Sequence, residues 1–174
     1  KIDKNYISIP KHIKFKTGNG FSAYGLFYGP KNKNYNGPKN HKYPLIIQTH
    51  GGPTASTSTA FDLKLQYWTS RGFSVFDINY RGSSGHGRKY RQSLYGFWGL
   101  YDVEDCINGV KTLIKDNKVD ETQVIIRGSS AGGYTTLASL TSNNIFNAAA
   151  SYYGISDLSS LRKNTHKFES YYLD

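Results

Sequence analysis

A serine enclosed by glycines stands out at residues 128–132, which read Gly-Ser-Ser-Ala-Gly. Ser130 is the centre of a Gly-x-Ser-x-Gly pattern, whereas centring it on Ser129 would put Arg127 and Ala131 in the glycine positions. A strand-like apolar run precedes the motif and a helix-like stretch follows it. A sharp strand-to-helix turn strains the backbone of the central serine, and flanking glycines leave room for the crowded chain. The register therefore predicts that Ser130 is a nucleophile, because a flexible helix-capping loop would explain only the composition.

A serine nucleophile of this kind needs backbone N–H groups that stabilise the negatively charged oxygen of the tetrahedral intermediate. Ala131 follows the serine at a helix N-terminus, so its N–H is the first candidate donor. The second donor is expected in the loop after an earlier strand, where residues 50–53 read His-Gly-Gly-Pro. Because Pro53 has no N–H, we expect Gly52 or Gly51 to donate.

The elements that must position these residues can be predicted from hydrophobic periodicity and turn residues. Short apolar strands alternate with helices, which favours an α/β fold with a mostly parallel sheet covered on both faces. An Asn-Gly turn at residues 19–20 predicts an antiparallel hairpin at the start of the sheet. The expected strands are residues 12–16, 21–28, 44–49, 73–78, 124–126 and 148–153. The expected helices are one from Phe61 that ends before Gly72, one over about 98–118 and one after the serine motif through about 141.

Composition limits the possible functions. The 174 residues are the length of one domain, and the net charge of +10 raises nucleic acid as a partner. The lysines are scattered, however, and their densest group, residues 31–42, is typical of a solvated loop. We therefore expect no nucleic-acid partner. Cys106 is the only cysteine, so it predicts a buried core residue rather than a disulfide or a cysteine-based metal site, and we expect no metal or cofactor.

The N-terminus reads Lys-Ile-Asp-Lys-Asn and lacks the apolar core of a signal peptide. No stretch approaches the 18 or so apolar residues of a membrane-spanning helix. These features predict a soluble, cytoplasmic protein without a membrane partner. The absence of an initial Met suggests a segment cut from a longer chain.

Four motifs occur in a fixed order: His-Gly-Gly-Pro at 50–53, Asn-Tyr-Arg-Gly-Ser-Ser-Gly-His-Gly-Arg at 79–88, Trp-Gly-x-x-Asp-x-x-Asp-Cys at 98–106 and Gly-Ser-Ser-Ala-Gly-Gly-Tyr at 128–134. Together they are far more specific than any one of them. This set resembles the catalytic domain of the prolyl oligopeptidase family, especially its acylaminoacyl-peptidase and dipeptidyl-aminopeptidase-like branch. Residues 153–157 and 165–170 also resemble that branch.

The resemblance implies an α/β-hydrolase fold and a serine peptidase that cleaves short or N-blocked peptides through an acyl-enzyme. It assigns Ser130 as nucleophile and the N–H groups of Gly52 and Ala131 as oxyanion donors. In this interpretation residues 1–10 are a linker or the lead-in to the first strand, and residues 11–174 are a partial catalytic domain.

The resemblance implies a Ser-Asp-His triad, and its acid and base are harder to find in this chain. Only 44 residues follow Ser130, whereas the family carries both groups on loops after two later strands. We therefore expect truncation after about the sixth strand, with acid and base outside this chain and the isolated chain inactive. An internal Asp157–His166 pair has the right order and stays a weaker alternative. An uncovered sheet edge predicts a homo-oligomer, or association with the missing C-terminal part of the same domain.

Other residues leave alternatives open. Arg81 could steer a substrate carbonyl or carboxylate, but buried pairing with Asp102 or Asp105 is favoured. Residues 82–87 favour a turn over a phosphate cradle, since no Lys-Ser/Thr follows. His50 is a poor candidate for the base, because in this order the base follows the nucleophile. A carboxylesterase or lipase, or an inactive fragment acting as an interaction module, remain the alternative functions.

Overall fold

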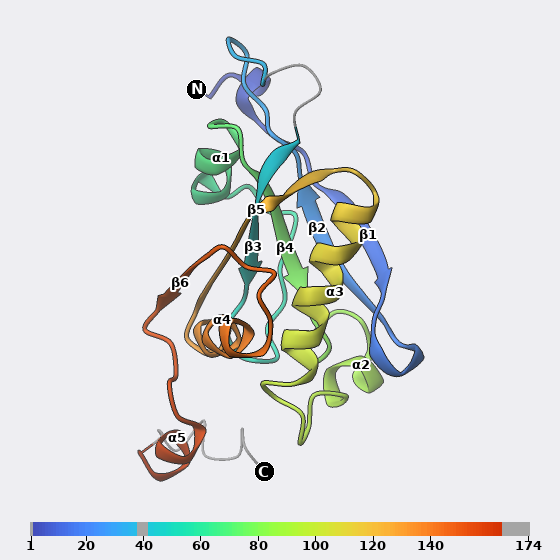
Figure 1. Cartoon of the computed structure of the whole chain (residues 1–174), viewed down its shortest axis with the longest axis vertical. Helices are drawn as coiled ribbons and strands as arrows, with labels where there is room; N and C mark the ends of the chain where they lie inside the picture. Colours follow the sequence, from blue (N-terminus) through green and yellow to red (C-terminus); the bar gives the residue numbers. More distant parts are fainter. Residues whose placement is uncertain (1, 38–41, 165–174) are drawn as a thin grey trace.

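The structure is a computed structural model that describes residues 2–37 and 42–164. Within these residues the chain forms one six-stranded sheet flanked by helices (Figure 1). The strands are β1 (Lys11–Lys16), β2 (Ser22–Tyr28), β3 (Tyr43–Thr49), β4 (Ser74–Asn79), β5 (Val119–Ser129) and β6 (Ala148–Tyr152). The helices are α1 (Leu63–Thr69), α2 (Arg88–Gln92), α3 (Tyr101–Lys115), α4 (Ala131–Ser142) and α5 (Leu158–Asn164), with single 3-10 turns η1 (Lys4–Tyr6) and η2 (Gly18–Gly20).

The strands are arranged in the order β1-β2-β4-β3-β5-β6. Strands β4, β3, β5 and β6 are parallel, and the β1–β2 hairpin is joined to β4 by antiparallel pairing. This confirms the predicted α/β class with a mostly parallel sheet. Because the carboxyl ends of parallel strands meet at one edge of a sheet, the segments after β3, β4 and β5 gather there.

The N-terminal hairpin turns where the Asn-Gly pair predicted. Asn19 has φ 56° and ψ 30°, and Gly20 has φ 73°, so both central residues adopt the left-handed conformation that a type I′ turn requires. The N–H of Phe21 donates to the carbonyl of Gly18 across the turn at 3.1 Å. Lys16 then pairs with Ser22 at the start of the ladder.

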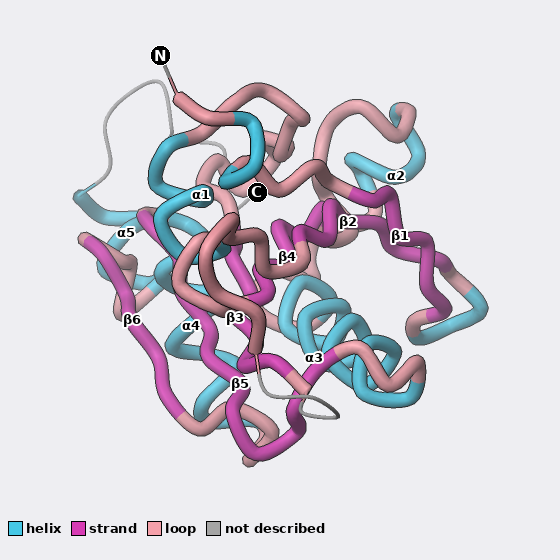
Figure 2. The backbone as a smooth tube through the Cα atoms, turned by 90° about the horizontal axis from the view of Figure 1, so that it is seen from above, coloured by secondary structure: helices cyan, strands magenta, loops and turns pink. Residues whose placement is uncertain are grey.

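Each face of the sheet has its own apolar cluster, as expected for strands buried on both sides. In β3, Leu45 and Ile47 belong to the larger cluster with Val110 of α3, whereas Ile46 packs on the other face with Leu65 of α1. Figure 2 shows α1 and α3 on opposite sides of the sheet.

The N-terminal boundaries of two helices differ from the predicted ones. Helix α1 begins after Asp62, whose carboxylate accepts from the N–H of Lys64 at 2.8 Å, so the exposed Phe61 lies outside it. Helix α3 begins at Tyr101 rather than at Trp98. The short helices α2 and α5 were not predicted. Tyr90 is the one apolar side chain of α2, and α5 has only Leu158 and Leu161, so neither shows a clear helical period.

The segment before β1 is attached to helix α1. The N–H of Ser8 donates to the side-chain oxygen of Gln66 at 2.8 Å, and the amide nitrogen of Gln66 donates back to the carbonyl of Ser8 at 3.0 Å. Both residues are buried. This reciprocal pair holds residues near the N-terminus against the domain.

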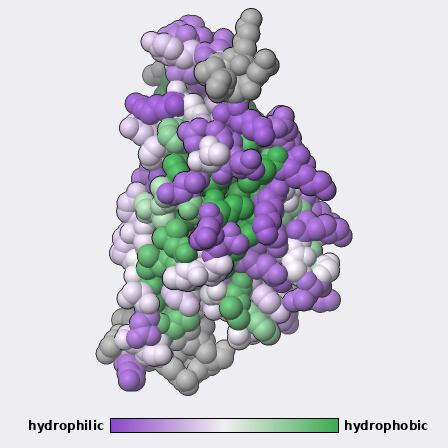
Figure 3. All heavy atoms as spheres, in the orientation of Figure 1, coloured by the Kyte–Doolittle hydropathy of each residue, from purple (hydrophilic) through white to green (hydrophobic). Residues whose placement is uncertain are grey.

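Strand β6 forms the edge of the sheet within the described part of the chain, pairing only with β5. Leu137 and Leu140 of the adjacent α4, and Tyr152 of β6, are exposed. Figure 3 shows apolar surface in the middle of the displayed face, with more hydrophilic surface above it. Among the described helices, none combines the length and the apolar character needed to cross a membrane.

Candidate active site

Ser130 lies at a sharp turn between the end of β5 and the start of α4. Its φ of 55° and ψ of −121° fall in a region that residues with a side chain rarely adopt. The N–H of Ser130 donates to the carbonyl of Tyr152 at 3.1 Å, and its own carbonyl accepts from the N–H of Tyr134 at 3.2 Å. The residue is exposed, so the strained turn presents the serine at the carboxyl edge of the sheet.

The two motif glycines lie where no side chain fits. A Cβ on Gly128 would collide with Thr49 Oγ1 and with the carbonyl of Gly132. A Cβ on Gly132 would meet the carbonyl oxygens of Thr49 and of His50, the second at 2.6 Å. The chain therefore packs against the end of β3 so closely that these positions require glycine.

The Gly-Gly loop lies beside the serine. A Cβ built on Gly51 would be 3.6 Å from Ser130 Cβ and 3.4 Å from the carbonyl oxygen of Ser129. Among residues 2–37 and 42–164, the N–H groups of Gly52 and Ala131 donate to no acceptor. The Ala131 N–H also stands at the N-terminus of the 12-residue helix α4, where the dipole favours negative charge. The role of both groups as oxyanion donors stays a prediction.

His50 is occupied in holding its own loop. Its Nδ1 lies 2.8 Å from the carbonyl oxygen of Gly51, and its Nε2 lies 2.7 Å from Ser83 Oγ. The ring stacks on Tyr80 with centroids 4.4 Å apart. Burial lowers the pKa of His50, which keeps the imidazole neutral near pH 7. Both nitrogens therefore point to partners other than Ser130, in agreement with the sequence argument against a base.

Arg81 is fully buried in an ion pair. Its Nε lies 3.0 and 3.1 Å from the two carboxylate oxygens of Asp105, and Glu104 accepts from Nη2. The guanidinium stacks over the ring of Tyr101 at 4.1 Å. A guanidinium without exposed surface cannot contact a substrate in this arrangement. The buried pairing that the sequence favoured is what the structure shows, and the substrate-steering alternative has no support from the position of Arg81.

Asp102, the other proposed partner of Arg81, serves a different purpose. One carboxylate oxygen accepts from the N–H of Gly99 at 2.6 Å, and the other accepts from Thr135 Oγ1 at 2.5 Å. Burial raises the pKa of Asp102 to about 6, although both hydrogen bonds act to lower it. Asp102 thus closes the start of α3 and ties it to α4.

The described residues do not complete a triad around Ser130. Its hydroxyl makes no hydrogen bond within residues 2–37 and 42–164. Asp157 caps α5 instead, accepting from the N–H of Ser159 at 2.8 Å and from Ser160 Oγ at 2.7 Å. His166, its proposed partner, lies outside the described residues. In that part of the chain no group of three or more His, Cys, Asp or Glu side chains is arranged to hold a metal ion.

Residues outside the predicted set also shape the site. The hydroxyl of Thr49 donates to the carbonyl of Gly132 in α4. The hydroxyl of Tyr80 donates to the carbonyl of Pro53, and Ser83 Oγ contacts Nε2 of His50, so both residues hold the His-Gly-Gly-Pro loop. Tyr80 and Ser83 lie inside the 79–88 motif, so that motif was the signal for them. The run at 82–87 leads away from the end of β4 into α2, as the turn interpretation predicted.

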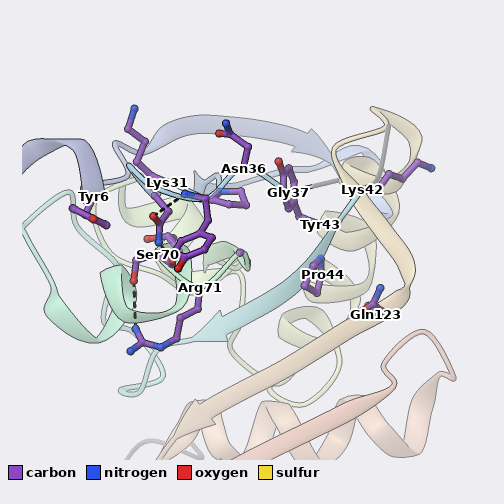
Figure 4. Close-up of a pocket in the computed structure, with 15 residues that line it drawn as sticks. Tyr6, Lys31, Asn36, Gly37, Lys42, Tyr43, Pro44, Ser70, Arg71 and Gln123 are labelled. Carbon is purple, nitrogen blue, oxygen red and sulfur yellow. Dashed lines mark hydrogen bonds between the residues drawn. The ribbon is translucent and has the colours of Figure 1, made fainter. Parts of the chain in front are cut away.

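A large cavity lies away from the serine. It measures about 950 Å³ and is lined at the amino ends of β3 and β5 by Tyr43 and Gln123, together with Lys31 and Arg71 (Figure 4). Figure 4 shows the side chains of Lys31 and Arg71 pointing in different directions rather than converging. Since Ser130 follows the carboxyl end of β5, this cavity is at the opposite end of the sheet from the serine.

Comparisons with known proteins agree with this geometry. Residues 59–174 match the sequence profile of the prolyl oligopeptidase family. A puromycin-hydrolyzing peptidase of Mycobacterium tuberculosis superposes with a TM-score of 0.96 at 42% identity, over 99% of this chain and 26% of that chain. The acylaminoacyl peptidase of Pyrococcus horikoshii superposes with a TM-score of 0.76 at 30% identity, over 86% of this chain and 24% of that one.

Curated sequences give the same result over shorter stretches. The dipeptidyl aminopeptidase BIII of Pseudoxanthomonas mexicana is 35% identical over 108 residues, which are 62% of this chain and 16% of that protein. The acylamino-acid-releasing enzyme of Arabidopsis thaliana is 40% identical over 93 residues, 53% of this chain and 12% of that protein. The chain thus spans about a quarter or less of the length of these relatives.

Proposed function

The chain belongs to the prolyl oligopeptidase family of peptidases, which share an α/β-hydrolase fold, and from this premise we propose that it carries the nucleophile of a serine peptidase. The observation that carries the proposal is the conformation of Ser130. Its φ of 55° at a strand-to-helix turn is a strained geometry of the kind that a nucleophile requires. The loop with Gly51, which we propose supplies the second oxyanion donor, lies beside Ser130.

In the proposed reaction, Ser130 Oγ attacks the carbonyl carbon of the scissile bond while a base takes the hydroxyl proton. The N–H groups of Gly52 and Ala131 stabilise the oxyanion. The intermediate collapses, the amine leaves with the proton, and an acyl group remains on Ser130 until water hydrolyses it. Residues 2–37 and 42–164 place no base beside Ser130, and the chain covers only about a quarter of the structures that it matches. We therefore propose that acid and base come from outside these 174 residues.

The proposed substrates are short or N-blocked peptides. Support comes from relatives whose names specify such chemistry, an acylamino-acid-releasing enzyme and a dipeptidyl aminopeptidase. The structural neighbour from Mycobacterium tuberculosis is described as a puromycin-hydrolyzing peptidase.

The direct test compares peptide anilides, free or acylated at the N-terminus, with nitrophenyl esters, using the full-length protein that contains this chain. We expect peptide cleavage that disappears in Ser130→Ala. Fast ester turnover without detectable peptide cleavage would instead support the carboxylesterase or lipase alternative.

A second candidate, favoured by the exposed edge at β6, is an interaction module that acts without catalysis. The exposed Leu137 and Leu140 beside this edge are apolar surface that a partner would cover. Light scattering of the isolated 174-residue chain tests it: this candidate requires association that increases with concentration and decreases in Leu140→Lys. A phosphonate that labels Ser130 in the full-length protein contradicts a purely non-catalytic role.

A further inference from the structure

The peptide bond between Gly51 and Gly52 has a fixed orientation in the structure. The carbonyl oxygen of Gly51 lies 2.8 Å from Nδ1 of His50. A carbonyl oxygen only accepts hydrogen bonds, so Nδ1 must carry the proton. The imidazole of His50 therefore donates to the Gly51 carbonyl and holds it on the side of the His50 ring.

The ring of His50 is itself held in place on two sides. Ser83 Oγ lies 2.7 Å from Nε2, and the ring of Tyr80 stacks on it with an interplanar angle of 19°. Ser83 Oγ also lies 2.7 Å from the carbonyl oxygen of Tyr80, to which its single proton is donated. The tautomer of His50 is therefore assigned from the Gly51 carbonyl, and Ser83 holds the ring in place on its Nε2 side.

Orientation of the carbonyl decides where the next N–H points. The Gly51–Gly52 peptide is trans, and in a planar trans peptide the C=O and N–H point in opposite directions. Directing the Gly51 carbonyl toward His50 therefore directs the Gly52 N–H away from His50. That N–H donates to no acceptor among the described residues, and the neighbouring Gly51 lies against Ser130.

The orientation of the Gly51–Gly52 peptide needs a hydrogen bond to fix it, because two consecutive glycines leave the backbone free to rotate. Neither Gly51 nor Gly52 has a Cβ, and Gly52 adopts φ 123°, so rotation of this peptide meets little steric resistance. The hydroxyl of Tyr80 lies 3.1 Å from the carbonyl oxygen of His50 and 3.0 Å from that of Pro53. Tyr80 thus anchors both ends of the loop, while His50 fixes the peptide between them.

We propose that His50 is a positioning residue that holds the Gly52 N–H in the orientation required for an oxyanion donor, by donating from Nδ1 to the Gly51 carbonyl. The inference rests on the proposed function, since it assigns a task within the same site. His50 touches neither the substrate nor the hydroxyl of Ser130; it acts through the backbone.

The test uses three variants of the full-length protein. In His50→Asn the amide nitrogen is attached to Cγ, as Nδ1 is in histidine, so it can still reach the Gly51 carbonyl. In His50→Gln the nitrogen is one bond further away, and His50→Leu has no donor. We expect kcat to fall on the order of 10²-fold in His50→Leu and His50→Gln, as for loss of one oxyanion donor, with KM nearly unchanged. His50→Asn should retain kcat within about tenfold of the wild type.

A peptide boronate, which forms a tetrahedral adduct on the serine, gives a second readout. Its inhibition constant should rise in parallel with the loss of kcat/KM across the same variants, while melting temperatures report folding. Equal losses in folded His50→Asn and His50→Gln, or losses confined to KM, would overturn the inference.

Ser83→Ala keeps the imidazole and its stacking, and it tests the inference even where the His50 variants do not fold. Its kcat should fall with KM unchanged, because the His50 ring loses its contact at Nε2, and an unaltered kcat contradicts the need for a fixed His50 ring. Ser130→Ala separates the two claims. Full activity in Ser130→Ala rejects the proposed function, whereas an inactive Ser130→Ala beside a fully active His50→Leu rejects only the inference.

Discussion

The hydroxyl of Thr49 lies 2.9 Å from the carbonyl oxygen of Gly132, so the last residue of β3 is tied to the first turn of α4. The same hydroxyl lies 3.1 Å from the carbonyl oxygen of Arg127 and 3.4 Å from Thr136 Oγ1. Thr49 directly precedes the His-Gly-Gly-Pro loop, and the segment it contacts carries Ser130. One buried hydroxyl therefore couples the two segments that supply the proposed oxyanion donors.

Thr49→Val keeps the shape of this side chain and removes the hydroxyl. We expect a loss of about 1–3 kcal/mol in the free energy of unfolding, because buried groups lose a hydrogen-bond partner. The value of kcat should fall as well, since the two donor segments lose their tie. Denaturant titration and steady-state kinetics measure the two effects. Thr49→Ser is the matched control and should stay close to the wild type; a Thr49→Val protein as stable and active as Thr49→Ser contradicts the prediction.

Gly128→Ala tests the close packing of the strand-to-helix turn at Ser130. A methyl group there would collide with Thr49 Oγ1, so we expect a loss of about 3 kcal/mol in the free energy of unfolding, together with a loss of activity. Gly29→Ala is the control, because a Cβ at Gly29 meets no atom within 4 Å. Its stability should change by less than about 1 kcal/mol. Equal unfolding midpoints for the two variants would contradict the close packing of this turn against Thr49.

Arg81→Met removes one partner of a fully buried ion pair. We expect a loss of about 3–5 kcal/mol in stability, because the buried carboxylate of Asp105 loses its cationic partner and keeps only its hydrogen bonds from Thr17 and from the backbone N–H of residue 81. The double variant Arg81→Met with Asp105→Leu should recover part of the lost stability, and a double-mutant cycle measures the interaction energy between the two residues. A substrate-steering role predicts the opposite pattern, a raised KM at unchanged stability.

Asp102 gives a pH dependence with a defined sign. Burial raises its pKa to about 6 in the folded state from 3.8, so the folded state binds the proton more tightly than the unfolded state. The resulting stabilisation is fully present below pH 4 and is lost as the pH rises through 6. Relative to Asp102→Asn, the wild type should therefore lose stability between pH 4 and pH 7. Denaturant titrations at four pH values measure this difference, and a difference that does not vary with pH contradicts the prediction.

Local patterns in the sequence predicted the parts of the fold that depend on neighbouring residues. The Asn19–Gly20 turn and the strand–serine–helix register around Ser130 follow from local backbone chemistry, and both are confirmed in the structure. The comparisons confirm the α/β-hydrolase fold and the prolyl oligopeptidase family.

Contacts between segments that are distant in the sequence could not be predicted in the same way. Asp102 and Asp105 are three residues apart on α3, and sequence alone could not tell which carboxylate faces Arg81. Thr49 was read only as the end of a strand, since its partners lie more than 70 residues away. The orientation of the His50 ring likewise depends on Ser83, which comes from the turn after another strand.

Labelling with a fluorophosphonate tests the central claim, that Ser130 is the nucleophile, most directly. The full-length protein, its Ser130→Ala variant and its Ser129→Ala variant are treated alike, and the adduct is located by mass spectrometry of peptides. We predict a single adduct on Ser130 in the wild type and in Ser129→Ala, and none in Ser130→Ala. An adduct that persists in Ser130→Ala, or that is lost only in Ser129→Ala, contradicts the assignment.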